Sequence, residues 1–147
     1  KTLADQLRNS KKRIVLTNGC FDFLHAGHVA FLQQARALGD TLILAMNTDE
    51  SIRRIKEPPR PLISQMQRAE LLASIDAVDY IVLMDDDTPH EIIRLLQPEL
   101  LVKGSNYSLD QVEGAEIVYN YGGKVTTLPA VLDISTKRLV QGMQPPE

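Results

Sequence analysis

Residues 17–28 read TNGCFDFLHAGH, and this stretch decides the fold because it joins a strand to a helix through a glycine turn. The apolar run RIVL at residues 13–16 predicts a buried strand, and Gly19 permits the chain to leave it sharply. Gly27 lets the backbone approach a ligand closely, just before a helix that we expect to begin at His28. Because helix N-termini attract anions, the stretch predicts a phosphate site.

Two histidines, His25 and His28, lie three residues apart in this stretch. Imidazoles at a helix N-terminus can donate hydrogen bonds to phosphate oxygens as charge develops on them. The alternatives are that the two side chains merely share a helix face, or that they bind a metal ion. Zinc sites normally need three or four ligands, and the third histidine, His90, is distant in the sequence. The sequence therefore favours phosphate and predicts no metal site formed by the protein.

Length and composition define the class of protein. A chain of 147 residues predicts a single domain, residues 1–147, with residues 1–12 as a short polar helix or lead-in and residues 141–147 as a frayed end. A net charge of −3 and 5% aromatic residues give no surface suited to nucleic acid. The sequence has no membrane-length apolar run, and its single cysteine, Cys20, cannot form an internal disulfide, so we expect a cytoplasmic protein without a membrane partner.

Short apolar strands alternate with helical segments along the chain. The predicted strands are residues 13–16, 41–47, 80–84, 100–103 and 124–128. The predicted helices are a segment from His28, residues 64–75 capped by Ser64, a segment from Pro89 capped by Thr88, and residues 112–121. This alternation predicts an α/β fold with a doubly wound, parallel five-stranded sheet.

Ligands of such folds bind beyond the carboxyl ends of the strands. The segments that leave the strands at this edge are residues 18–28, 47–49, 103–107 and 129–136, and we expect them to converge. The irregular stretch RRIKEPPRPLI, residues 53–63, carries adjacent prolines and several basic side chains, and is called the basic loop below. This pattern is typical of a mobile or ligand-ordered lid, although a solvated basic loop has the same composition.

The order of the motifs resembles a known family. TNGCFD and HAGH are followed by NTD at residues 47–49, RPL at residues 60–62, QR at residues 67–68, LVKG at residues 101–104 and IST at residues 134–136. Together they resemble the HxGH nucleotidyltransferases of the cytidylyltransferase-like superfamily over nearly the whole chain. Within it, the phrase LLVKGSNY is most similar to the adenylyltransferases that make ADP-heptose for bacterial lipopolysaccharide. The resemblance implies a Rossmann-like nucleotidyltransferase fold.

The resemblance also implies a role for each matching residue. It assigns catalysis to His25, His28 and Lys56. It assigns nucleotide binding to Asn18, Gly19, Phe21, Asp22, Gly27, Lys103, Gly104, Ser135 and Thr136. It assigns substrate binding to Asn47, Asp49, Arg60, Arg68 and Asn106. The implied partners are ATP with Mg²⁺ and a sugar 1-phosphate, and the implied assembly is a homodimer or a larger homo-oligomer.

The implied reaction transfers AMP from ATP to D-glycero-β-D-manno-heptose 1-phosphate, giving ADP-heptose and pyrophosphate. Where relatives often have KGGDY, residues 103–107 read KGSNY, so Asn106 supplies an amide in place of a carboxylate. Residues 131–133 lack the arginine and glycine of some cytidylyltransferases, which argues against a glycerol-phosphate enzyme. The alternatives are a cytidylyltransferase acting on glycerol 3-phosphate or another small phosphate ester, and a non-catalytic nucleotide sensor.

Overall fold

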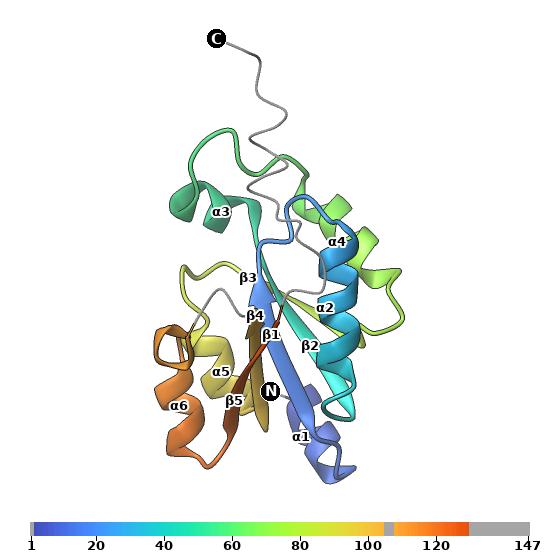
Figure 1. The fold of residues 1–147 in the computed structure, drawn as a ribbon, viewed down its shortest axis with the longest axis vertical. Helices are drawn as coiled ribbons and strands as arrows, with labels where there is room; N and C mark the ends of the chain where they lie inside the picture. The colour runs from blue at the N-terminus through green and yellow to red at the C-terminus, as the bar shows by residue number, and fades with distance from the viewer. Residues whose placement is uncertain (1, 105–107, 130–147) are drawn as a thin grey trace.

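A computed structural model describes residues 2–104 and 108–129, so Asn106, Ser135, Thr136 and the expected frayed end lie outside the described residues. Five parallel strands form one sheet in the order β3-β2-β1-β4-β5 (Figure 1). Their bounds are β1 (Ile14–Gly19), β2 (Thr41–Asn47), β3 (Tyr80–Met84), β4 (Leu100–Gly104) and β5 (Lys124–Leu128). This order confirms the predicted doubly wound, parallel five-stranded α/β fold.

Helices cover both faces of this sheet. They are α1 (Thr2–Asn9), α2 (Ala26–Arg36), α3 (Asp49–Ile55), α4 (Gln65–Ala73), α5 (His90–Leu96) and α6 (Ala115–Asn120), with a 3₁₀ turn at Leu109–Gln111. α2 and α4 pack on one face, whereas α1, α5 and α6 pack on the other, and α3 lies beyond the carboxyl ends of the strands (Figure 1). Among the described residues, no helix is long and apolar enough to cross a membrane.

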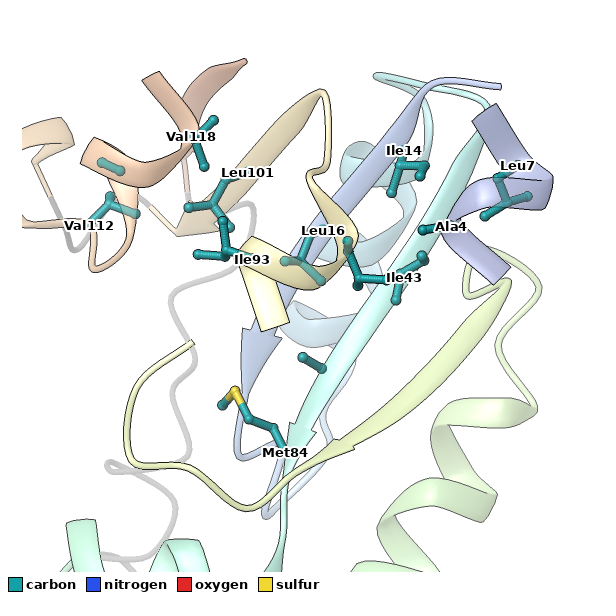
Figure 2. Packing of buried hydrophobic residues seen from close by; sticks show 13 residues of the cluster. Ala4, Leu7, Ile14, Leu16, Ile43, Met84, Ile93, Leu101, Val112 and Val118 are labelled. Carbon is teal, nitrogen blue, oxygen red and sulfur yellow. The ribbon is translucent and has the colours of Figure 1, made fainter. Parts of the chain in front are cut away.

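β2 explains why the core has two halves. All seven of its residues are buried, because helices cover both faces of a central strand. Alternate side chains of a strand point to opposite faces, so Leu42 and Leu44 join the cluster under α2 and α4. Ile43 and Ala45 join the cluster under α1, α5 and α6, where Figure 2 shows Ile43 beside residues from these helices such as Ala4.

The chain changes direction across the sheet between β1 and β4. From β1 it proceeds through β2 to β3 at one edge, and it then returns to β4 and β5 on the other side. β1 pairs with β2 from Ile14↔Thr41 to Gly19↔Met46, whereas its register with β4 consists of Val15↔Leu100 and Leu16↔Leu101. The carboxyl ends of β1 and β4 therefore part at the topological switch point, where doubly wound folds bind ligands.

Two helices begin at residues other than those predicted. α2 begins at Ala26 rather than His28, because the side chain of His25 caps the helix and draws the next residues into its first turn. α5 has Pro89 as its N-cap in place of Thr88, because the carbonyl of Pro89 is the first to accept a helical hydrogen bond. The predicted Ser64 cap of α4 is confirmed by a hydrogen bond that its hydroxyl accepts from Gln67 N at 3.4 Å.

Two further boundaries, at α3 and α6, differ from the prediction. Residues 53–55 of the basic loop belong to α3, a helix that the sequence analysis missed and that Thr48 caps through its hydroxyl. α6 is shorter than the predicted segment because Gly114, with φ 89°, precedes its first turn. The short polar helix expected within residues 1–12 is confirmed as α1, whose apolar side chains pack on the sheet.

Candidate active site

The HxGH motif forms its own helix cap. His25 has an extended backbone (φ −140°, ψ 175°) and occupies the N-cap of α2, where its Nδ1 accepts a hydrogen bond from Gly27 N at 3.1 Å. In the reciprocal contact, His28 Nδ1 accepts a hydrogen bond from the backbone N–H of His25 at 3.2 Å. The two imidazoles thus replace the serine and glutamate of an ordinary capping box and fix each other in place.

These hydrogen bonds also define the protonation of both rings. Because each Nδ1 accepts, the ring proton lies on Nε2 and the imidazoles are neutral. Burial lowers the pKa of His25, and burial together with the neighbouring His25 lowers the pKa of His28 from 6.5 to about 4. The two rings stack with their centroids 3.9 Å apart. At neutral pH the pair therefore offers Nε2–H donors without positive charge.

One of these donors lacks an acceptor. His25 Nε2 is buried and has no hydrogen-bond partner among the described residues. A buried donor without a partner costs about 1–3 kcal/mol, so a ligand oxygen that accepted this hydrogen bond would be favoured. The donor lies beside the N-terminus of α2, where backbone N–H groups and the helix dipole favour an anion. The geometry is therefore suited to a phosphoryl oxygen.

Gly19 and Phe21 shape the loop between β1 and the histidines. Phe21 has φ 49°, in the left-handed region, and its ring lies over Gly19, where an added Cβ would stand 3.0 Å from a ring carbon. The same ring is tilted against His28, with centroids 5.4 Å apart. A side chain at Gly19 would displace the ring that packs against the second histidine.

A single carboxylate fastens the basic loop to this segment. The side chain of Asp22 is fully buried and forms an ion pair with Arg60, whose Nε donates at 2.5 Å. The same carboxylate accepts hydrogen bonds from Leu62 N at 2.7 Å and Ile63 N at 3.0 Å. The far end of the basic loop is thus held against the residues that precede the histidines.

Arg68 is a second buried connection. Its side chain is 1% exposed, and its Nη1 donates to the carbonyls of Cys20 and Asn47, each at 2.7 Å. Its Nε donates to Ile63 O at 3.0 Å, and its Nη2 donates to Asp49 Oδ1 at 2.8 Å. These partners come from the segments after β1 and β2 and from the basic loop, so Arg68 holds together three of the segments that surround the site.

The remaining cations lie on β4 and after α3. Lys103 is half-buried and donates from Nζ to Asn18 O at 2.8 Å, and burial lowers its pKa to about 8. Lys56 is exposed, but its charge acts on both Lys103 and Cys20. Burial raises the pKa of the Cys20 thiol, whose Sγ lies 3.7 Å from Asn47 Oδ1. A protonated thiol is a poor nucleophile, so this cysteine gives no sign of covalent catalysis.

The arrangement of strand, glycine turn and histidine cap can be compared with known proteins. The model of the family described as cytidylyltransferase-like matches residues 16–139, which begin within β1 and include all the later strands and helices described above. The chain belongs to the cytidylyltransferase-like family. This confirms the family to which the motifs were assigned.

Individual members of the cytidylyltransferase-like family are close to this chain. The bifunctional protein HldE of Geobacter sulfurreducens is 52% identical over 130 residues, or 88% of this chain and 26% of the relative. The bifunctional protein HldE of Alcanivorax borkumensis is 50% identical over 137 residues, or 93% of this chain and 29% of the relative. The chain thus spans less than a third of the length of these relatives.

A solved structure has the same fold. It is described as the lipopolysaccharide core biosynthesis protein of Thermoplasma volcanium, and it matches with a TM-score of 0.66 and 23% identity over 81% of this chain and 96% of that chain. At this identity the likeness supports the cytidylyltransferase-like fold and nothing finer.

Most of the residues assigned from the family resemblance lie around this edge of the sheet. Those joined by the contacts above are Asn18, Gly19, Phe21, Asp22, His25, Gly27, His28, Asn47, Asp49, Arg60, Arg68 and Lys103. Gly104 is the last residue of β4, and Lys56 ends α3. The three residues outside the described part are Asn106, Ser135 and Thr136. The ligand contacts of all these residues stay predictions.

The sequence analysis missed an acidic segment, residues 85–87, that follows β3. Asp87 Oδ1 accepts a hydrogen bond from Arg54 Nε at 2.8 Å, and Thr48 Oγ1 donates to Asp85 Oδ1 at 2.6 Å. These contacts hold α3 against the end of β3. The signal was present, because β3 also ends at this edge and is followed by three consecutive aspartates.

Proposed function

We propose that this chain transfers AMP from ATP to D-glycero-β-D-manno-heptose 1-phosphate, producing ADP-heptose for the lipopolysaccharide core and releasing pyrophosphate. The observation that carries the chemistry is the neutral histidine pair at the N-terminus of α2, with one buried Nε2–H donor left without an acceptor among the described residues. The identity to two HldE proteins and the segment LLVKGSNY support the choice of acceptor.

The reaction needs alignment more than acid–base catalysis. An oxygen of the sugar phosphate attacks the α-phosphorus of ATP, a P–O bond forms, and the bond to the pyrophosphate oxygen breaks. The nucleophile is already an anion at neutral pH, so no side chain has to remove a proton. The protein must instead hold two polyanions together and stabilise the charge on the phosphoryl oxygens, which preorganised donors do well.

The described side chains divide this work. His25 and His28 supply neutral Nε2–H donors to the transferring phosphoryl group, and these hydrogen bonds strengthen as charge develops on its oxygens. Lys56 and Lys103 supply positive charge that offsets the repulsion between the two phosphates. Asp22 and Arg68 hold the surrounding segments in place.

Magnesium enters this proposal as part of the Mg–ATP substrate. Among the described residues, no group of three or more histidine, cysteine or acidic side chains is placed to hold a metal ion. Two carboxylates beside the histidine segment are engaged in ion pairs, since Asp22 pairs with Arg60 and Asp49 pairs with Arg68. Phosphate oxygens and water suit Mg²⁺ without protein ligands. We further propose a cytoplasmic location, where ATP is available, and a homodimeric or larger assembly.

Pyrophosphate release tests this function. ATP and CTP are each supplied with Mg²⁺ and either heptose 1-phosphate or glycerol 3-phosphate, with a His28→Ala protein as the control. Release with ATP and heptose 1-phosphate alone, lost in the variant, supports the proposal. Release with CTP and glycerol 3-phosphate keeps the mechanism and replaces the substrates. Nucleotide binding without release in any combination favours a sensor instead.

A further inference from the structure

Lys103 stands where the ladder between β1 and β4 is interrupted. The two strands pair at Val15↔Leu100 and Leu16↔Leu101, and Lys103 lies two residues beyond this register on β4. Its Nζ donates to the carbonyl of Asn18 on β1 at 2.8 Å. In a continuous parallel sheet that carbonyl would accept from a backbone N–H of the neighbouring strand. A side-chain amine therefore joins the two strands at the switch point.

The contact reaches the segment that carries the histidines. Asn18 is the first residue of the 18–28 segment, and the next residues are Gly19 and Cys20, whose carbonyl is held by Arg68. Two buried or half-buried cations thus bind carbonyls at the end of β1 and just after it, Lys103 from β4 and Arg68 from α4. The charge of Arg68 is balanced by the carboxylate of Asp49.

The surroundings of the Lys103 amine make its charge sensitive to a ligand. Its pKa is lowered to about 8, mainly by burial, and the positive charge of Lys56 contributes to this lowering. Cys20 after β1 and Glu113 before α6 act in the opposite direction. Lys56, Cys20 and Glu113 are thus titratable groups of the described chain whose charges act on this amine. A polyphosphate bound at the switch point would bring several negative charges to this position and favour the ammonium form.

We propose that Lys103 is a positioning residue that holds the end of β1, from which the histidine-bearing loop leaves, through the Asn18 carbonyl, and that binding of a nucleoside triphosphate here is coupled to uptake of a proton by its amine. This inference rests on the proposed function only in requiring a nucleoside triphosphate at the site. It does not depend on which sugar or base is used.

The coupling has a defined sign and size. With a pKa of about 8 in the free protein, the amine is about one-quarter protonated at pH 8.5, so binding takes up about three-quarters of a proton. Above pH 8 the affinity for nucleotide should fall by up to about tenfold per pH unit until the pKa of the complex is reached. At pH 8.5 His25 and His28 are neutral in the free protein.

Calorimetry of the 147-residue chain tests the coupling. ATP and CTP are titrated in the presence of Mg²⁺ at pH 8.5, in two buffers of different ionisation enthalpy, so that the difference in heat counts the protons taken up. The variants are Lys103→Met, which removes the amine, and Lys103→Arg, which keeps the charge at every pH. The control is Lys124→Met, which removes an exposed lysine from the neighbouring strand.

We expect uptake of about three-quarters of a proton in the wild type and in Lys124→Met, and less than about 0.2 in both Lys103 variants. Lys103→Arg should bind nucleotide with an affinity that changes little between pH 7.5 and 9.5, and this variant decides the test if Lys103→Met does not fold. Equal uptake in wild type and Lys103→Arg overturns the inference while leaving the proposed function intact. Proton uptake that depends on Lys103, in a protein that does not turn over heptose 1-phosphate, overturns the proposed function alone. Failure to bind either ATP or CTP overturns both the inference and the proposed function.

Discussion

His28 performs two tasks through its two ring nitrogens, and substitutions can separate them. Its Nδ1 accepts the hydrogen bond from His25 N that completes the cap of α2, while its Nε2–H is the donor assigned to the transferring phosphoryl group. Asparagine places an oxygen near the position of Nδ1 but has no atom at Nε2. Glutamine can place a donor near Nε2 but has no acceptor at Nδ1. Alanine removes both contacts.

The two losses differ in size and in the quantity they affect. Loss of one preorganised donor costs about 3 kcal/mol of transition-state stabilisation, which lowers kcat about 100-fold or more. Loss of the cap acceptor costs about 1 kcal/mol of folding free energy, or about 2–4 °C in Tm for a domain of this size. His28→Asn should therefore keep the Tm and lose the rate, whereas His28→Gln should lose Tm and keep most of the rate.

The assay pairs kcat for pyrophosphate release at saturating substrates with Tm from circular dichroism, for the three variants and the wild type. His28→Ala should show both losses together. A kcat for His28→Asn within about threefold of the wild type would refute the assignment of Nε2 as a transition-state donor. Loss of about 3 kcal/mol of transition-state stabilisation would lower kcat far more than this.

Three further outcomes follow from the contacts. The Tm of the free protein should fall as pH drops from 6.5 toward about 4, because the pKa of His28 is lower in the folded than in the unfolded protein, so protonation favours unfolding. An equally steep fall in His28→Asn would contradict this. Arg68→Met should lower the free energy of unfolding in urea by about 3–5 kcal/mol, because it leaves the partly buried Asp49 carboxylate without its cation, whereas the exposed Arg53→Met should change it by less than about 0.5 kcal/mol. Asp22→Asn should speed trypsin cleavage of the basic loop at least about tenfold, because each charge-assisted hydrogen bond to Asp22 contributes about 1.5–3 kcal/mol to holding the loop. An unchanged cleavage rate would show that other contacts hold the loop.

The fold could be predicted because its signal is local. Residues 42–46 of β2 form an unbroken apolar run, and the structure buries every residue of this strand between two helical layers. β1 is longer than predicted, since the strand continues beyond the apolar run through residues 17–19. These residues are strand because they pair in register with residues 44–46 of β2, and such pairing between distant segments leaves no apolar pattern in β1 itself.

The site could be predicted only as a set of residue types. The spacing of the two histidines and the glycine between them indicated a phosphate site at a helix start, and this depends on neighbours in the sequence. It could not indicate that the histidines cap the helix with their own side chains, because that depends on backbone angles at His25. Nor could it pair Arg60 with Asp22, since two charges 38 residues apart are brought together by the fold alone.

These pairings change what the basic residues of the site can do. The charges of Arg60 and Arg68 are balanced by Asp22 and Asp49, so these arginines contribute order more than attraction for phosphate. The histidine pair adds donors without adding charge. With two paired arginines and two neutral histidines, the site holds bound phosphates less tightly than it would if all four side chains were unpaired cations. Its neutral donors interact more strongly only as charge develops on the phosphoryl oxygens. Binding energy is thereby directed to the transition state rather than to the substrate or to departing pyrophosphate.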